Sequence, residues 1–252
     1  MLEWSAMTTN PQLATLLTDT LGLTSPPIAV RFVESAPAGV PRFEGEVPSA
    51  CTFWRRAERG TFYADASAHF NCLIGTHTMG LPMPAEKGPE LMALIGQMGE
   101  AQYFSDAEVP HVPTVPGDKS GIVYGPLASF EDTPDAVLVW LTPYQSMLMQ
   151  EAAGTAAWSA QPGIPTFGRP SCAAIPVALG RGVATQSLGC MGMRVFTEVA
   201  QDKLLGVLPK QLLDELPAGL NRVADANQKM AQHYRGQKAL HSREPNPRPA
   251  QV

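Results

Sequence analysis

The chain has 252 residues, of which 44% are apolar and 16% charged, and its formal net charge is −5. This length accommodates one large domain or two half-sized ones, and the apolar content is typical of a globular protein with a sizeable core. The acidic balance leaves no basic stripe, so we expect no nucleic-acid partner.

The sequence shows no segment suited to a membrane. Its longest apolar run, Ala136 to Leu141, is far too short to cross a bilayer. An early acidic residue and the lack of an apolar stretch argue against a signal peptide in residues 1–12. We therefore expect a cytoplasmic protein without a membrane partner, in which thiols stay reduced.

The first half begins with a predicted helix at residues 10–21, which takes Asn10 as its N-cap and ends at Gly22. A β-branched run bounded by prolines predicts a strand at 26–33. A short helix, a second strand and an amphipathic helix starting near Pro89 are predicted further along.

The second half follows a proline-rich connector. An apolar strand in "DAVLVWLTP" is predicted to be buried on both faces, and "YQSMLMQEAAGTAAW" predicts a helix. The segment "MRVFTEVAQDKLLGVL", from about Met193, is also predicted to be helical, and one or two terminal helices follow at 209–235.

These elements predict an α/β fold of two related halves, with mixed sheets covered by helices, a helical C-terminus and a disordered tail. The two halves share an order of strand, loop, cysteine, second cysteine, glycine and helix, which suggests a weak internal repeat. The predicted parts are residues 1–104 with Cys51 and Cys72, the connector 105–120, residues 121–240 with Cys172 and Cys190, and the tail 241–252.

The four cysteines form two separated pairs with similar spacing. Cys51 and Cys72 are spaced C-x20-C, Cys172 and Cys190 are spaced C-x17-C, and 99 residues lie between the pairs. In a reducing compartment such cysteines point to metal binding or catalysis rather than disulfides. Close C-x2-C knuckles, the usual sign of structural zinc, are lacking, whereas an iron–sulfur cluster needs only four thiolates that converge in space. We expect these four residues to bind one [4Fe–4S] cluster.

Neighbouring residues fit this expectation. Gly75, Gly189 and Gly192 would let backbone N–H groups approach the sulfur atoms, and Arg194 would add positive charge. His69 precedes Cys72 by three residues, which is a spacing that metal ligands use, so a site of three cysteines and His69 stays open. The alternative for His69 is a hydrogen bond to a carbonyl group.

Several segments resemble the bacterial and archaeal family called domain of unknown function 169. They are "PPIAVRF", "CTFWRRAERG", "NCLIGTHTMGL", "YGPL", "PDAVLVWLTPYQSM" and "SLGCMGMR", which span roughly residues 26–205 in the family's order. The family's C-x-G-x-R element corresponds to Cys190, Gly192 and Arg194. Its first element matches Cys51 and Gly60, with Ala57 one position later than in the family. The resemblance implies α/β character and a shared role for the cysteines, and it matches Cys172 least closely.

The leading functional hypothesis is an iron–sulfur protein that transfers electrons or activates a substrate, for example in sulfur transfer. Its partner would be a redox protein or a small molecule, and a homo-oligomer is compatible with the sequence. One alternative is a structural or regulatory zinc protein. Another is a cofactor-free binding module or an enzyme with a cysteine nucleophile, activated by His69 or His77. The residues do not identify the reaction, nor a catalytic group.

Overall fold

The computed structural model describes residues 8–103, 112–154 and 165–241. These residues contain a seven-stranded sheet with the order β2-β3-β1-β4-β7-β6-β5. Neighbouring strands are antiparallel except β5 and β6, which are parallel, so the sheet is mixed. The strands are β1 (Ile28–Val33), β2 (Phe62–Asp65), β3 (Gly121–Pro126), β4 (Ala136–Leu141), β5 (Thr166–Phe167), β6 (Thr185–Ser187) and β7 (Leu204–Pro209).

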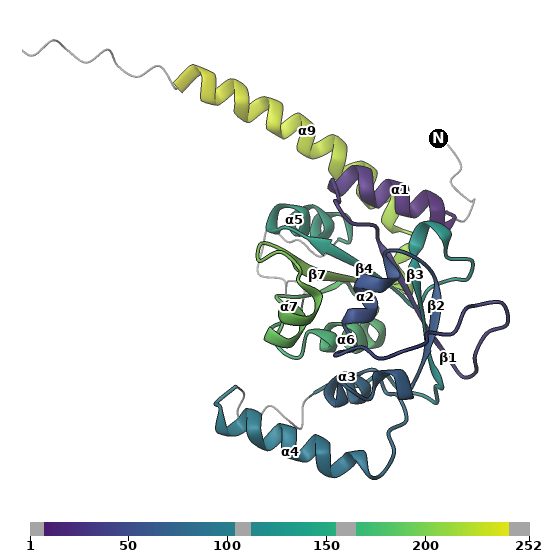
Figure 1. Cartoon of the computed structure of the whole chain (residues 1–252). Helices are drawn as coiled ribbons and strands as arrows, with labels where there is room; N and C mark the ends of the chain where they lie inside the picture. Colours follow the sequence, from purple (N-terminus) through teal and green to yellow (C-terminus); the bar gives the residue numbers. More distant parts are fainter. Residues whose placement is uncertain (1–7, 104–111, 155–164, 242–252) are drawn as a thin grey trace, which may run out of the picture.

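Helices cover both faces of this sheet (Figure 1). The α-helices are α1 (Asn10–Leu21), α2 (Thr52–Ala57), α3 (Leu73–Thr78), α4 (Lys87–Glu100), α5 (Pro143–Ala152), α6 (Ala174–Arg181), α7 (Met191–Thr197), α8 (Lys210–Leu213) and α9 (Leu216–His241). Single turns of 3₁₀-helix are η1 (Ser67–His69), η3 (Leu127–Ser129) and η4 (Ser171–Ala173).

The central strand β4 shows why two layers of helices are needed. Its side chains alternate between two hydrophobic clusters, with Val137 and Val139 in one and Leu138 and Trp140 in the other. The first cluster is completed by α1, α5 and the start of α9, and the second by α2, α6 and α7. Because all six residues of β4 are buried, neither face of this strand can be left to solvent.

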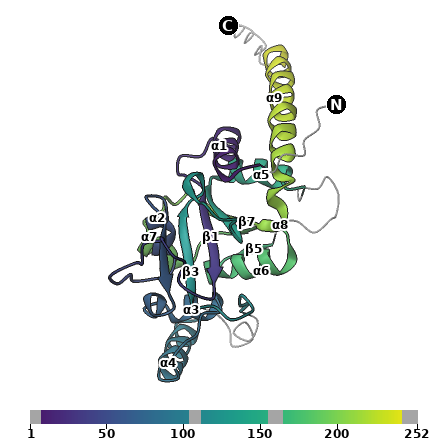
Figure 2. The same cartoon turned by 90° about the vertical axis from the view of Figure 1, so that its right-hand side faces the viewer.

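Two helices extend from this body at opposite ends (Figures 1 and 2). Only the first part of α9, up to Val223, contributes buried residues, and the rest of the helix leads away from the sheet. None of the residues of α4, which contacts α3, is fully buried; Leu94 and Ile95 are half-exposed and Met92 is 63% exposed. Among the described helices, none combines the length and the apolar character that crossing a membrane requires.

The predicted α/β class is confirmed, and so is the helix at residues 10–21. Its N-cap is Thr9 rather than Asn10, because the Gln12 side chain accepts a hydrogen bond from Thr9 N at 3.0 Å. The Asn10 side chain instead donates to the Phe130 carbonyl at 2.7 Å. The helix ends at Gly22 as predicted, with the left-handed backbone (φ 64°) that glycine adopts without strain.

The helix predicted to run on from Met193 is partly wrong. The segment forms the short helix α7, which ends at Glu198 in left-handed conformation (φ 50°), and then the strand β7. All six residues of β7 are buried, because it lies between β4 and β6. A short and wholly apolar run does not distinguish a helix from a buried strand.

The two predicted halves build one sheet rather than a sheet each. β1 of the first half lies between β3 and β4 of the second half, so the halves share their backbone hydrogen bonds. The relation between the halves as a repeat stays a prediction. Residues 105–111 of the predicted connector and residues 242–252 of the predicted tail lie outside the described residues.

Candidate metal centre

The four cysteines occupy equivalent local positions, each directly before or in the first turn of a helix. Cys51, Cys72 and Cys190 are the residues that precede α2, α3 and α7, and Cys172 lies in η4, which leads into α6. All four are free thiols. Cys51 and Cys172 are buried within the second hydrophobic cluster, and Cys190 packs against it while half-exposed.

Contacts link the cysteines of the first half. Gly75 lies so close to them that a Cβ atom there would be 2.8 Å from Ala50 Cβ and 2.9 Å from Cys72 Sγ. Ala50 is adjacent to Cys51 in the chain, and its backbone N–H, like that of Gly75, interacts with the Cys72 sulfur. The glycine thus permits the loop before α2 to pack directly on the start of α3.

A second set of contacts links the cysteines of the other half. The Cys190 backbone N–H donates to Ser171 Oγ at 2.6 Å, which ties the start of α7 to η4. The Cys190 Sγ atom accepts a hydrogen bond from Met193 N at 3.4 Å and so caps α7. Ser171 is adjacent to Cys172, so both thiols of this half belong to one local structure.

Helix packing then brings the two halves of the site together. α2 packs against α7 (Figures 1 and 2), and α3 packs against η4. The buried hydroxyl of Thr78, near the end of α3, interacts with the Cys172 thiol and has no hydrogen bond of regular geometry. Because a thiol is a weak acceptor with loose hydrogen-bond geometry, Thr78 lies beside Cys172 without forming a regular hydrogen bond.

The thiols also affect one another electrostatically. Burial raises the pKa of Cys51 to about 12, and the Cys72 and Cys190 thiols add to this rise against the Ser49 hydrogen bond. Burial likewise raises the pKa of Cys72, with a further contribution from Cys190. It raises the pKa of Cys172 well above its usual value, with the other three thiols contributing. Such mutual effects require that the four thiols share one neighbourhood.

Among the described residues, however, no three His, Cys, Asp or Glu side chains are placed to ligate one metal ion. Four thiolates around zinc would have to approach one another to about 4 Å, because the zinc–sulfur bond is only about 2.3 Å long. The cysteines share one neighbourhood, but as they stand they form no site for a single ion.

The ring nitrogens of His69 bind Asp65 and Tyr124 rather than a cysteine of this site. Its Nδ1 is 2.7 Å from the Asp65 carbonyl oxygen, so this nitrogen must carry the proton, and Nε2 accepts from the Tyr124 hydroxyl at 3.1 Å. Burial lowers the pKa of His69 to about 4, against a smaller upward effect of the Asp65 carbonyl. Both ring nitrogens of His69 are bonded to protein groups. His69 is therefore a buried hydrogen-bonding residue, and its bond to a carbonyl group is the predicted alternative to metal binding. His77, in the last turn of α3, is exposed.

Arg194, Gly189 and Gly192 have mainly structural surroundings. The Arg194 guanidinium donates to the carbonyl groups of Leu188, Gln201 and Lys203, and so clamps the segment before α7 to the one after it. Gly189 has φ 89° and lies against the Arg194 side chain. A Cβ atom at Gly192 would touch only the Phe196 ring, at 3.9 Å. Gly75, by contrast, interacts with the Cys72 sulfur through its backbone N–H.

Two serines and a tyrosine of the site were not predicted. The Ser49 hydroxyl lies 3.0 Å from Cys51 Sγ, and Ser171 binds the Cys190 backbone. The sequence holds a signal for both, because each follows a proline and precedes a cysteine in "PSAC" and "PSC". Tyr124 is buried and stacks on Phe53 in α2, and its pKa is raised well above the usual value by burial and by the thiols of the site. Nothing in the local sequence marks Tyr124.

A family comparison covers all of these residues. The model of DUF169, described as an uncharacterised ArCR, matches residues 16–219. The chain belongs to the DUF169 family. This confirms the resemblance found in the sequence segments, and the matched range includes all four cysteines. Comparison with curated proteins and with solved structures gives no significant match.

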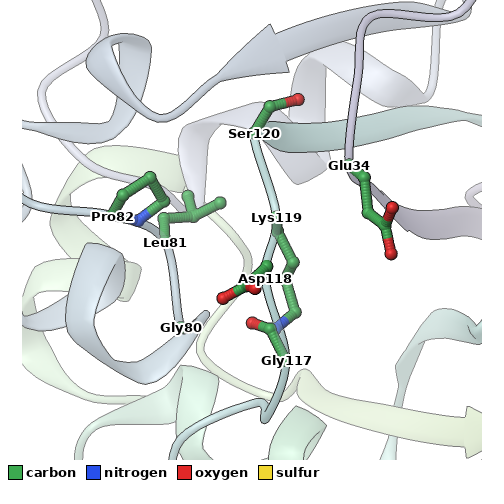
Figure 3. A pocket seen from close by; sticks show the side chains of 8 residues that line it. All are labelled: Glu34, Gly80, Leu81, Pro82, Gly117, Asp118, Lys119 and Ser120. Atoms are coloured by element: carbon green, nitrogen blue, oxygen red, sulfur yellow. The ribbon is translucent and has the colours of Figure 1, made fainter.

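This DUF169 protein also has a surface hollow of about 550 Å³ at the opposite end of α3 from Cys72 (Figure 3). Glu34, Asp118 and Lys119 are its charged lining residues. Lys119 Nζ donates to the carbonyl groups of Val115, Pro116 and Gly117 at 2.6–3.0 Å. All three ammonium hydrogens are therefore used to hold the chain, so Lys119 has no N–H left to donate to a ligand in the hollow. The cysteine site is therefore the stronger candidate for a functional site.

Proposed function

We propose that this protein is an iron–sulfur protein that binds one [4Fe–4S] cluster through Cys51, Cys72, Cys172 and Cys190. One observation carries the proposal: four cysteines from two distant parts of the chain meet at a single site, where their thiols affect one another's pKa. Buried cysteines that served only as small apolar residues would have no reason to converge in this way.

A [4Fe–4S] cluster and a single ion differ in how closely their ligands must lie. In a [4Fe–4S] cluster each thiolate binds a different iron, so the sulfur ligands lie farther apart than around one metal ion. The described residues hold no group suited to a single ion, which disfavours the zinc alternative. The raised pKa values do not oppose metal binding, because thiols release their protons when a metal displaces them.

The position of the site supports exchange with a partner. Cys190 is half-exposed, and Leu188 and Met191 on either side of it are exposed. A buried cluster with one edge near the surface suits electron transfer to a redox protein or activation of a small molecule. We propose these two roles, with sulfur transfer or removal as an example of the second, as the function of the centre.

The experiment is anaerobic purification followed by iron and acid-labile sulfide analysis and absorption spectroscopy. The proposal expects iron and sulfide in equal amounts and a broad absorption band near about 400 nm, which is a property of such cofactors. Each single Cys→Ser variant should lose iron, because the cluster then lacks a ligand. Ala57→Ser is the matched control, since it adds a hydroxyl group to buried α2 six residues from Cys51.

Three outcomes separate the alternatives. A colourless protein without iron after anaerobic reconstitution would refute the cluster proposal. Stoichiometric zinc that depends on the same cysteines would establish the zinc alternative instead. Protein that takes up neither metal, and whose Cys→Ser variants behave like the Ala57→Ser control, would leave the cysteines as independent thiols.

A further inference from the structure

A positively charged side chain lies at the exposed edge of the cysteine site. The guanidinium carbon of Arg169 is 4.2 Å from the centre of the Tyr103 ring, in a cation–π contact. Tyr103 follows α4, and Arg169 belongs to the segment that leads into η4. The pair thus joins two parts of the chain that are 66 residues apart, just where both approach the start of α7.

Both residues are anchored next to Cys190. The Tyr103 hydroxyl accepts a hydrogen bond from the Met191 backbone N–H at 3.0 Å. Ser171, two residues after Arg169, accepts one from the Cys190 backbone N–H at 2.6 Å. The cation and the hydroxyl group therefore both lie next to the residue pair Cys190–Met191.

The donors of this pair are available to a ligand. Arg169 is exposed and, within residues 8–103, 112–154 and 165–241, forms no ion pair with a carboxylate. By contrast, the Arg194 guanidinium is bound to carbonyl groups. The Tyr103 oxygen uses a lone pair for Met191, so its own hydrogen is free to donate.

The surface beside the pair is apolar. Leu188, Met191 and Val195 are 52%, 60% and 62% exposed, and Met191 and Val195 share one face of α7. Binding sites for small molecules commonly combine such an apolar wall with one or two polar groups that orient the ligand.

We propose that Arg169 and Tyr103 bind the carboxylate of a small apolar acid and hold that acid in front of Cys190. One guanidinium fork and one hydroxyl donor match the two oxygens of a carboxylate. A single positive charge also balances a single negative charge, whereas a phosphate dianion would stay partly uncompensated. The hydrocarbon part would lie on Leu188, Met191 and Val195. This inference names the substrate class of the proposed function and depends on that function for its role, although the binding itself does not require a cluster.

The test uses the full chain in its reduced, cluster-free form and two alkylating probes. Iodoacetate carries a carboxylate and iodoacetamide is its neutral analogue, so the ratio of their rates at Cys190 reports attraction of the anion. The rates are measured by mass spectrometry of the peptide that contains Cys190. Arg169→Gln should lower the iodoacetate-to-iodoacetamide ratio at least about threefold, the size of an exposed charge interaction.

Arg181→Gln is the matched control, because it removes an equal charge from the end of α6 that is remote from Cys172. Its ratio should equal that of the unchanged protein. Tyr103→Phe, which keeps the ring under the guanidinium but loses the hydroxyl donor, should give a smaller decrease than Arg169→Gln. Equal ratios in all four proteins would overturn the proposal.

A second measurement asks whether added anions protect Cys190 of the unchanged protein from alkylation. It tests the site even if Arg169→Gln also changes the iodoacetamide rate. At equal ionic strength, hexanoate should slow the reaction of Cys190 with iodoacetate more than acetate does, because of its apolar chain. Phosphate that protects as well as hexanoate would overturn the assignment to an apolar carboxylate, and a lack of protection would overturn the site. Since no cluster is present, a protein that passes this test yet never takes up iron refutes the proposed function and leaves the anion site standing.

Discussion

Gly75 is the position where a single added methyl group should separate two of the four cysteines. In Gly75→Ala the new Cβ would lie 2.8 Å from Ala50 Cβ and 2.9 Å from Cys72 Sγ. Comfortable contacts between such atoms are about 3.5–4.0 Å, so each neighbour would have to move by roughly 1 Å. The movement would separate the loop before Cys51 from Cys72.

Gly96→Ala provides the matched control. Gly96 lies in α4, and a Cβ atom there meets nothing within 4 Å. Both variants gain the better helix propensity of alanine, so the difference between them reports the crowding alone. We expect Gly75→Ala to be about 1 to 3 kcal/mol less stable than Gly96→Ala, which is the usual cost of overpacking.

The assay is urea unfolding of the reduced, cluster-free proteins, followed by iron analysis after anaerobic reconstitution. Gly75→Ala should unfold at lower urea and retain less iron, whereas Gly96→Ala should match or exceed the unchanged protein in stability. If the two variants were equally stable and loaded iron equally, the close packing of Ala50, Gly75 and Cys72 would not be as described.

Three further predictions concern titration and packing. The pKa of His69 is lowered from 6.5 to about 4, so between these values only the unfolded state binds the proton. The free energy of unfolding should therefore fall by about 1.4 kcal/mol per unit as pH drops through this window, and His69→Gln should lose that slope in urea midpoints measured at each pH. Because the pKa of Cys51 is raised to about 12, iodoacetamide at pH 9 should leave Cys51 unmodified in peptide maps of the folded, cluster-free protein, and its rapid labelling would contradict the burial. Gly219→Ala places a Cβ atom 2.0 Å from the Ala152 carbonyl oxygen, so thermal unfolding should show a loss of at least about 2 kcal/mol relative to Gly236→Ala, whose Cβ meets nothing within 4 Å.

The elements that could be predicted are those whose signals are local. The helix at residues 10–21 carries a proline in its first turn, an apolar face and a glycine end, and each of these acts over a few residues. The strand β4 is apolar throughout, bounded by turns and short, which identifies it as a buried strand. The strand β7 has a similar composition, but the six residues between α7 and β7 hold neither proline nor glycine, so the sequence predicts one continuous helix there.

What distinguishes β7 is a contact distant in sequence. A Cβ atom at Gly206 would lie within 3 Å of Leu141, Val139 and Met149 side-chain atoms, so this position accepts only glycine because β4 and α5 pack against it. A glycine that would weaken a helix is required here in a sheet. That requirement is invisible until the partner strand is known.

The cysteine site likewise has features that follow from the sequence and features that only the tertiary structure decides. The sequence by itself determined that the four cysteines stand near prolines and glycines and that no close knuckle joins any two of them. Only the tertiary structure decided that they meet, because the order of strands in the sheet and the packing of α2 on α7 and of α3 on η4 bring the two pairs together. It also placed His69 on Tyr124 and Arg194 on carbonyl groups, and it set Arg169 on the Tyr103 ring. The physical reason is that turn and cap preferences depend on neighbours in the chain, whereas the partners of a side chain depend on which surfaces the fold must bury together.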